Sequence, residues 1–368
     1  MNIFIIAGDP SGDEYGAELM KNMLVINPNI KFNGIGGPLM TQQGLNSIVS
    51  FHKMAVMGFM EVIKALPFFL NLEKQIIRLI QKEKPDKIIL IDYPGFNLRI
   101  CKKIKRKINC QILYYISPQI WAWKEKRINI IKSYVDKMFV IFDFEKKWYA
   151  KHKIDVEYFG HPFLDIWDKN NISDFVQKYQ LNMEKPIITL FPGSRSQELN
   201  KHFNLFVDAA LKIKNDVPDL QIMAGIHTDI KPPIINNKDI IIVNDEPLKA
   251  LEVATCALVA SGTATLQAAI MNTPAIVIYK MNVLSWRITK QLVQVNFASM
   301  ANIIANELVF PELLQSEANI KNITKVGVKM IKEENYKNTI ISNMKLIRNK
   351  IGGSGASKKI ANAMLNIN

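Results

Sequence analysis

Short apolar runs alternate with longer stretches of helical spacing along the whole chain. In the first half, apolar runs of strand length lie at residues 3–7, 87–92, 111–116, 137–141 and 156–159. The stretches between them have helical spacing, as where Ile100, Ile104 and Ile108 recur four residues apart. Buried strands separated by helices predict a parallel sheet that is covered on both faces.

The same pattern restarts in the second half. A polar stretch at residues 165–182 is interpreted as an interdomain helix or linker, and apolar runs follow at 187–191, 221–224, 239–243, 256–260 and 275–278. Two successive doubly wound units predict an α/β protein with two Rossmann-like domains facing a central cleft, where ligands of such folds usually bind. The final stretch has helical spacing, which Gly-Gly-Ser-Gly at 352–355 interrupts.

The composition supports a globular protein with a full-sized core, because 48% of the residues are hydrophobic and 22% are charged. No apolar run approaches the ~18–20 residues that are needed to span a bilayer. The apolar start, residues 1–7, has no basic region before it and is interpreted as a first strand rather than a signal peptide. The three cysteines show neither metal-type spacing nor a disulfide framework, which suits a reducing cytoplasm.

The formal net charge is +14, from 47 basic and 33 acidic residues. Such an excess favours contact with nucleic acid, an acidic lipid surface or phosphorylated substrates. The chain is also generally rich in Lys, Asn and Ile, and a biased base composition would produce the same charge. The charge alone therefore does not select a function.

A glycine-containing loop follows the first apolar run, with the sequence Gly-Asp-Pro-Ser-Gly-Asp at residues 8–13. Glycines allow the backbone to approach a ligand closely, and the helix that follows offers unpaired N–H groups at its N-terminus. The loop is not the G-x-G-x-x-G fingerprint of dinucleotide binding. A plain tight turn remains the alternative.

Two loops in the second half have the same placement between a strand and a helix. Residues 192–195 read Pro-Gly-Ser-Arg and residues 261–265 read Ser-Gly-Thr-Ala-Thr. Backbone N–H groups, the helix dipole and the guanidinium of Arg195 together suit a diphosphate. The pair predicts a site for a nucleotide diphosphate and its sugar, and ordinary turns with helix caps are the alternative.

Asp92 ends a strongly apolar run and precedes Tyr-Pro-Gly-Phe-Asn. A carboxylate at the carboxyl end of a strand opens into the ligand crevice and can act as a general base. The alternative is that Asp92 caps the helix that follows, near Asn97.

Two further segments combine apolar or aromatic residues with a surface function. Residues 54–70 are apolar and rich in Met, which is compatible either with core packing or with acyl chains and a membrane interface. Residues 121–127 read Trp-Ala-Trp-Lys-Glu-Lys-Arg, which could stack nucleic-acid bases but also suits a membrane interface. No recognised nucleic-acid motif accompanies them. His161 lacks a second histidine at metal-binding spacing and is interpreted as structural.

Seven segments, taken in order along the chain, closely resemble the lipid-A-disaccharide synthase family. They lie at residues 7–13, 54–58, 91–97, 117–123, 160–162, 192–195 and 261–265, and the likeness extends to about residue 314. The resemblance implies a GT-B glycosyltransferase with two Rossmann-like domains and final helices that cross back onto the N-terminal domain. It assigns residues 1–168, joined by 345–368, to acceptor and lipid binding, and 169–344 to the UDP-sugar.

The same resemblance implies the reaction. The family transfers 2,3-diacylglucosamine from UDP-2,3-diacylglucosamine to the 6-hydroxyl of 2,3-diacylglucosamine 1-phosphate, with inversion, and releases UDP. It uses no cofactor and no bound metal, and it works on the inner face of the cytoplasmic membrane. No nucleic-acid partner is expected, and a homodimer is compatible with the sequence.

Carried over by position, Asp92 matches the proposed base for the acceptor hydroxyl, Arg195 an arginine assigned to the diphosphate, and Asn302 a functional asparagine. Asp9 stands where many relatives have Glu, and Gln267 where they usually have a Glu that binds the ribose. The expected nucleotide-sugar site comprises Gly193, Ser194, Arg195, Ser261, Gly262, Thr263, Ala264, Gln267 and Asn302. The expected acceptor side comprises Gly8, Asp9, Ser11 and Gly12, and the expected lipid-facing residues are Met57, Phe59, Met60, Phe68 and Phe69.

Two other functions remain compatible with parts of the sequence. Another GT-B enzyme, such as a different UDP-N-acetylglucosamine transferase or a UDP-sugar epimerase, would share the fold and the nucleotide loops. A basic nucleic-acid or membrane-binding protein without catalysis would explain the charge and residues 121–127. That second function would leave Asp92 and the three loops without a role.

Overall fold

The computed structural model describes residues 1–51, 54, 59–167, 172–227, 230–231, 233, 237–260, 262–282, 286–287, 291 and 295–367, without the side chains of 59–65. The chain folds into two compact units. The N-terminal unit comprises Met1–Trp167 and Ile351–Asn368, and the C-terminal unit comprises Asp168–Lys350.

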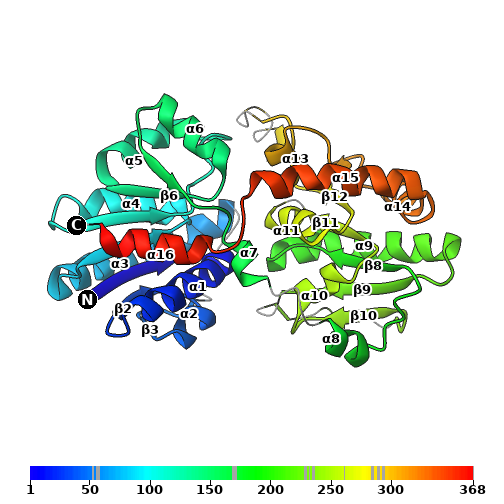
Figure 1. The fold of residues 1–368 in the computed structure, drawn as a ribbon, viewed down its shortest axis with the longest axis horizontal. Coiled ribbons are helices and arrows are strands. Elements are labelled where there is room, and N and C mark those ends of the chain that lie inside the picture. Colours follow the sequence, from blue (N-terminus) through cyan, green and yellow to red (C-terminus); the bar gives the residue numbers. More distant parts are fainter. Residues whose placement is uncertain are drawn as a thin grey trace. The chain divides into compact units, whose positions relative to one another are not determined.

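Within the described residues, the N-terminal unit contains a seven-stranded parallel sheet in the order β3-β2-β1-β4-β5-β6-β7 (Figure 1). Its strands are β1 (Asn2–Ala7), β2 (Lys31–Ile35), β3 (Leu45–Ser47), β4 (Lys87–Ile91), β5 (Gln111–Tyr115), β6 (Lys137–Val140) and β7 (Val156–Tyr158). Its helices are α1 (Pro10–Ile26), α2 (Pro38–Gln42), α3 (Phe59–Glu83), α4 (Pro94–Ile104), η2 (Glu125–Arg127), α5 (Ile128–Tyr134), α6 (Asp143–Lys151), α7 (Phe163–Ile166) and α16 (Ala356–Asn366).

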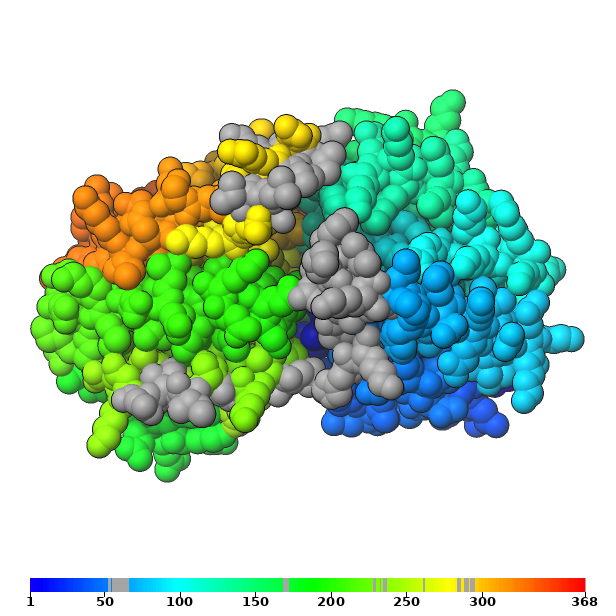
Figure 2. All heavy atoms as spheres, turned by 180° about the vertical axis from the view of Figure 1, so that it is seen from behind, coloured from blue at the N-terminus to red at the C-terminus, as the bar shows by residue number. Residues whose placement is uncertain are grey.

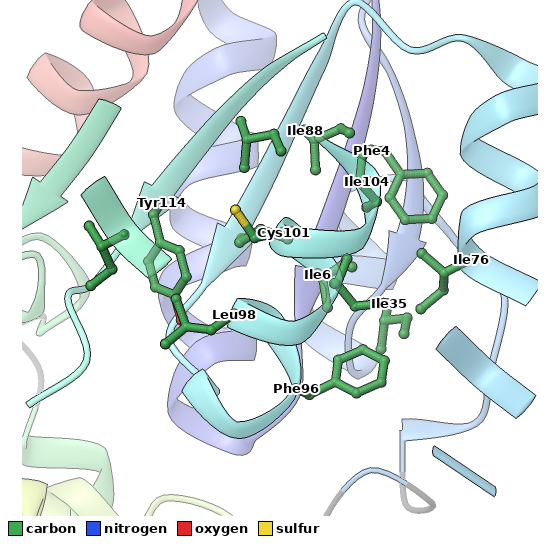
Figure 3. Packing of buried hydrophobic residues seen from close by; sticks show 14 of the residues in the cluster. Phe4, Ile6, Ile35, Ile76, Ile88, Phe96, Leu98, Cys101, Ile104 and Tyr114 are labelled. Carbon is green, nitrogen blue, oxygen red and sulfur yellow. The ribbon is translucent and has the colours of Figure 1, made fainter. Parts of the chain in front are cut away.

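The central strands are buried on both faces, as their continuous apolar runs predict. All five residues of β4 are buried, and Ile88 and Leu90 belong to one core cluster with residues of β1, α3 and α4. Figure 3 shows Phe4, Ile6 and Ile88 of the sheet in the same cluster as Ile104 of α4. Each fully buried side chain of this size contributes about 1.5–3 kcal/mol.

Helix α16 packs against α1, so the chain returns to the N-terminal unit after it has completed the C-terminal one (Figure 1). The return occurs at Ile351. Helix α15 (Glu334–Lys350) instead packs against α11, α13 and α14 of the C-terminal unit. The helical end of the chain is thus divided between the two units.

Within its described residues, the C-terminal unit contains a six-stranded parallel sheet in the order β10-β9-β8-β11-β12-β13. Its strands are β8 (Ile187–Phe191), β9 (Gln221–Gly225), β10 (Ile240–Val243), β11 (Cys256–Ala260), β12 (Ala275–Tyr279) and β13 (Glu312–Leu314). Its helices include α8 (Ser173–Lys178), α9 (Ser196–Asp216), α10 (Pro247–Glu252), α11 (Thr263–Met271), α13 (Met300–Ala305), α14 (Ile320–Lys332) and α15.

The structure confirms two doubly wound, parallel, Rossmann-like units. The apolar pattern did not predict β2, β3 or β13. The polar stretch interpreted as a linker contains α7 and α8, on either side of residues 168–171, which lie outside the described part of the chain.

Candidate active site

In each sheet, the strand order reverses at one point, between β1 and β4 in the N-terminal unit and between β8 and β11 in the C-terminal unit. Ligand-binding loops of open α/β sheets gather at the carboxyl ends of the strands at such points. Ala7 pairs with Ile91, so the loops that follow β1 and β4 leave the sheet as neighbours. Phe191 and Val259 pair in the same way at the ends of β8 and β11. The predicted loops therefore occupy the two switch points.

The loop after β1 is short because its first residues also cap α1. Asp9 is the N-cap, and its Oδ1 accepts a hydrogen bond from the Gly12 backbone N–H at 2.9 Å. Ser11 and Gly12 lie in the first turn of α1. At Gly8, a Cβ atom would lie only 2.5 Å from the ring of Tyr93, so a glycine is required for this close approach. The loop thus brings α1 directly against the turn that follows β4.

Asp13 anchors this loop to the next helix, a role that no motif in the sequence indicates. Its buried carboxylate accepts hydrogen bonds from the backbone N–H groups of Gly37, Leu39 and Met40, at 2.7, 3.0 and 3.0 Å. The carboxylate therefore satisfies donors at the start of α2 and fixes the position of α1. The sequence feature that could have indicated this role is an acidic residue on an otherwise apolar face of a helix.

The turn after β4 holds Asp92 in an unusual backbone conformation. Asp92 and Tyr93 have φ angles of 40° and 47°, in the left-handed region, which costs about 1–2 kcal/mol for each residue with a Cβ atom. The buried Asn97 amide donates to the carbonyls of Ile91 and Asp92 at 3.0 and 2.8 Å, and the Tyr114 hydroxyl donates to the Asp92 carbonyl at 2.6 Å. Tyr93, and not Asp92, occupies the N-cap position of α4. These contacts stabilise a strained turn at the predicted base.

Several carboxylates surround the same edge. Burial, followed by the charges of Glu14, Asp9 and Asp92, raises the pKa of Tyr15. Burial, together with Asp13 and Asp9, raises the pKa of Glu14 to about 7. This edge of the N-terminal sheet is therefore acidic, and it suits a group that accepts a proton from a hydroxyl.

In the C-terminal unit, the loop after β8 has the features of an anion site. Gly193 has a φ of +126°, and a Cβ atom there would lie 2.4 Å from Glu198 Cβ. Ser194 N–H donates to Glu198 Oε2 at 3.1 Å, and Arg195 Nη1 lies 3.5 Å from Glu198 Oε1. Arg195 is the N-cap of α9. A carboxylate thus already engages the backbone donor and the guanidinium that were predicted to bind a diphosphate.

The second loop precedes α11 at the neighbouring strand. Gly262 is the N-cap of α11 and has a φ of +138°, and no atom of the described residues lies within 4 Å of the position that a Cβ would take there. Thr263 is exposed and Ala264 half-buried in the first turn, and Gln267 is half-buried one turn later. Ser261 lies outside the described residues. The open helix N-terminus leaves room for a ligand to approach the backbone.

Asn302 has a different role from the one expected. It is fully buried, its Nδ2 donates to Phe310 O and Glu312 Oε1, both at 2.8 Å, and its Oδ1 accepts from the N–H groups of Val309 and Phe310. These four bonds use the hydrogen-bonding capacity of the amide. The expectation that Asn302 binds the nucleotide-sugar directly is therefore corrected, because its side chain fastens α13 to the segment before β13.

The residues expected to face lipid are only partly described. Met57 and the side chains of Phe59 and Met60 lie outside the described part of the chain. Phe68 is half-buried against the core of the N-terminal unit. Phe69 is 8% exposed and belongs to that core, so we correct its assignment: it packs on α4 instead of facing lipid.

Three other reactive side chains, Cys101, Cys256 and His161, are buried. Burial raises the pKa of the Cys101 and Cys256 thiols to about 12, and it lowers the pKa of His161 to about 3. Within the described residues, no group of His, Cys, Asp and Glu side chains is arranged to hold a metal ion. In the same part of the chain, no helix has the length and apolarity to cross a bilayer.

A family model for lipid-A-disaccharide synthetase matches residues 3–364. The chain belongs to this family. A lipid-A-disaccharide synthase of Coxiella burnetii (strain CbuK_Q154) is 34% identical over 370 residues, covering 100% of this chain and 98% of the relative. The enzyme of Trichlorobacter lovleyi is also 34% identical and covers 99% of this chain and 97% of its own. The protein is therefore a glycosyltransferase of lipid A biosynthesis.

Solved structures with the same fold are more distant. A UDP-GlcNAc 2-epimerase from Neisseria meningitidis aligns with a TM-score of 0.69 and 12% identity over 100% of both chains. The calicheamicin glycosyltransferase CalG4 aligns with a TM-score of 0.62 and 12% identity, over 100% of this chain and 98% of its own. At such identity the likeness shows the GT-B fold alone. The family match favours the lipid A transferase over the epimerase alternative.

Proposed function

We propose that the protein transfers 2,3-diacylglucosamine from UDP to the 6-hydroxyl of 2,3-diacylglucosamine 1-phosphate, with inversion at the anomeric carbon. The products are the β-linked disaccharide 1-phosphate and UDP. The observation that carries the proposal is the strained turn that holds Asp92 at the switch point of the N-terminal sheet. Strain at such a position is typical of functional sites, and membership of the family supports the substrate pair.

In this mechanism, Asp92 accepts the proton of the acceptor hydroxyl as the oxygen attacks the anomeric carbon. A sugar hydroxyl is a poor nucleophile at neutral pH, so a positioned base accelerates the attack by about 10²–10⁴-fold. The hydrogen bonds from Asn97 and Tyr114 go to main-chain carbonyls of the turn, so they orient the residue without requiring its carboxylate.

The departing UDP carries negative charge that the C-terminal unit would stabilise. The N-termini of α9 and α11 and the guanidinium of Arg195 provide positive potential at neighbouring strand ends. The Arg195 side chain is 37% exposed, and Glu198 contacts it in a position that a diphosphate can take over. The donor would approach the backbone closely at Gly193, Ser194, Gly262, Thr263 and Ala264. Gln267 would supply a neutral hydrogen-bonding group for the ribose.

The test is UDP release from UDP-2,3-diacylglucosamine, with and without acceptor, in detergent and EDTA. We expect release only with acceptor. Asp92→Asn removes the base but keeps a residue that tolerates the left-handed conformation, so turnover should fall about 10²–10⁴-fold while UDP affinity changes less than about twofold. Asp219→Asn, at an exposed surface ion pair, is the matched control and should keep full turnover. Loss of UDP affinity in Asp92→Asn would assign Asp92 a structural role.

We also propose that the N-terminal unit contacts the inner face of the cytoplasmic membrane. Trp123 is 39% exposed, and Lys124 Nζ lies 4.1 Å and the Arg127 guanidinium 5.8 Å from its ring centre. Leu66 and Leu70 of α3 are both 42% exposed. Figure 2 shows the light-blue and cyan side chains of α3 and α4 at the surface of this unit. An exposed tryptophan among cations is typical of a membrane interface.

Vesicle flotation tests this location. Wild-type protein should float with vesicles that contain anionic phosphatidylglycerol more than with neutral ones. The double variant Lys124→Ala/Arg127→Ala should lose about thirtyfold of this binding, since each basic residue near the surface contributes about 1 kcal/mol. Lys147→Ala removes an exposed charge on α6 and serves as the control. Equal binding by all three proteins would place the membrane contact elsewhere.

A further inference from the structure

His202 lies on α9, beneath the loop that follows β8. Its side chain is fully buried, yet both ring nitrogens have polar partners. Nδ1 lies 3.2 Å from the Pro192 carbonyl oxygen, and the Lys280 backbone N–H donates to Nε2 at 3.0 Å. A buried histidine with two main-chain partners from different segments is a cross-link between them.

The chemistry of the two partners fixes the form of the ring. A carbonyl oxygen only accepts and a backbone N–H only donates, so Nδ1 must carry the proton and Nε2 must be free to accept. The imidazolium form would place a second N–H group against the Lys280 N–H and break that bond. His202 can therefore make both bonds only as the neutral Nδ1–H tautomer.

The surroundings favour this neutral form. Burial lowers the pKa of His202, and the charge of Lys201 acts in the same direction. The Pro192 hydrogen bond and the charge of Glu198 oppose the shift without cancelling it. The ring of Tyr279, at the end of β12, lies 5.3 Å from the imidazole. Acid is therefore the condition that would disturb the cross-link.

The two segments that His202 joins lie at the carboxyl edge of the C-terminal sheet. Pro192 begins the loop that contains Gly193 and Arg195, and Lys280 follows β12. Strand β11 lies between β8 and β12, and its own loop leads to α11. The two His202 hydrogen bonds therefore join segments at the same edge of the sheet as the N-termini of α9 and α11, which belong to the proposed diphosphate site.

We propose that His202 is a positioning residue that holds the loop from Pro192 to Arg195 in the geometry that receives the diphosphate of the donor. The proposal rests on the proposed function, which places UDP at this edge. His202 does not touch the ligand. It acts by fixing the Pro192 carbonyl, and with it the backbone that leads to Gly193 and Ser194.

Two substitutions separate hydrogen bonding from packing. His202→Gln supplies an amide NH2 that can donate to Pro192 and an amide oxygen that can accept from Lys280, and it does not titrate. His202→Phe fills the space but leaves the buried Pro192 carbonyl and the partly buried Lys280 N–H without their His202 partner, which is the more costly change. His152→Gln, on the partly exposed histidine after α6, is the matched control in the other unit.

The experiment measures binding of UDP alone to the full-length protein by isothermal titration calorimetry, and amide hydrogen exchange at Lys280. We expect His202→Phe to bind UDP about tenfold or more weakly and to exchange the Lys280 amide faster. His202→Gln and His152→Gln should match the wild type in both measurements at pH 8. Well below the ordinary histidine pKa of about 6.5, wild-type affinity should fall more steeply than that of His202→Gln, because burial lowers the pKa of His202.

The outcomes distinguish this inference from the proposed function. If wild type, His202→Gln and folded His202→Phe bind UDP equally, the positioning role is overturned while the nucleotide site stands. If Gln and Phe weaken binding equally and both keep the wild-type fold by circular dichroism, the ring matters for packing and the hydrogen-bond role is overturned. If the wild type binds no UDP, the proposed function itself fails.

Discussion

Replacing Asn97 with alanine should release the turn that holds Asp92. Asn97 is fully buried in α4, and its Nδ2 donates to the carbonyls of Ile91 and Asp92 at 3.0 and 2.8 Å. After the substitution, the Asp92 carbonyl keeps the hydroxyl of Tyr114 as a donor. The variant therefore removes two of the contacts that oppose relaxation of the turn but leaves its covalent structure intact.

The magnitude follows from these contacts. One buried and one partly buried hydrogen bond, at about 1 kcal/mol each, contribute about 2 kcal/mol, and the better helix propensity of alanine offsets about 0.5 kcal/mol. The free energy of unfolding should therefore fall by about 1.5 kcal/mol. The two left-handed residues carry about 2–4 kcal/mol of strain. Loss of the Asn97 hydrogen bonds should therefore raise the population of relaxed turn conformations, relative to the strained one, by about tenfold or more. We expect kcat to fall by a similar factor.

The assay compares kcat and the KM for the UDP-sugar with the free energy of unfolding in urea. Asn22→Ala is the matched control, because the Asn22 Nδ2 also donates two hydrogen bonds, both at 2.8 Å, to Glu18 within α1. That variant should keep its kcat. A normal kcat in Asn97→Ala, together with the expected loss of stability, would refute the reasoning that Asp92 needs this anchor.

Three further substitutions test other parts of the molecule. Gly193→Ala should raise the KM for the UDP-sugar about tenfold with little change in kcat, because its Cβ would lie 2.4 Å from Glu198 Cβ; an unchanged KM would contradict this. The pKa of Glu14 is raised from 4.5 to about 7, so the unfolded chain releases its proton first as pH rises. The free energy of unfolding should then fall between those pH values, and Glu14→Gln should exceed the wild type by about 1–3 kcal/mol at pH 8 and equal it at pH 4 in urea titrations. Gly34→Ala should lose about 3 kcal/mol or more, measured by thermal unfolding, since its Cβ would lie 1.9 Å from the Ile5 carbonyl oxygen.

The central strands were predictable because burial on both faces leaves a continuous apolar run, as in β4 and β11. The strands that were missed are short or polar. Strand β2 reads Lys-Phe-Asn-Gly-Ile, β3 has three residues, and β13 begins with Glu312. Their pairing depends on neighbours that the tertiary fold supplies, which no local pattern records.

The position of Asp92 was predictable from the end of an apolar strand, but its conformation was not. In a sequence, left-handed backbone is predicted at glycine. Here Asp92 and Tyr93 adopt it, and Asn97 and Tyr114 stabilise it by donating hydrogen bonds to the Asp92 carbonyl. For Asn302, the resemblance identified the residue but not the contacts of its side chain. A resemblance transfers the residue, but only the structure shows that its amide is used within the protein.

The return of α16 to the N-terminal unit has a consequence for synthesis on the ribosome. Helix α16 covers α1, and the Lys87 amine donates to the carbonyl of Ile367. The roughly 180 residues of the C-terminal unit emerge between them, which takes about 10–40 s at ordinary rates of translation. Throughout that interval the nascent N-terminal half lacks the helix that covers part of α1, so the half that is made first is completed last.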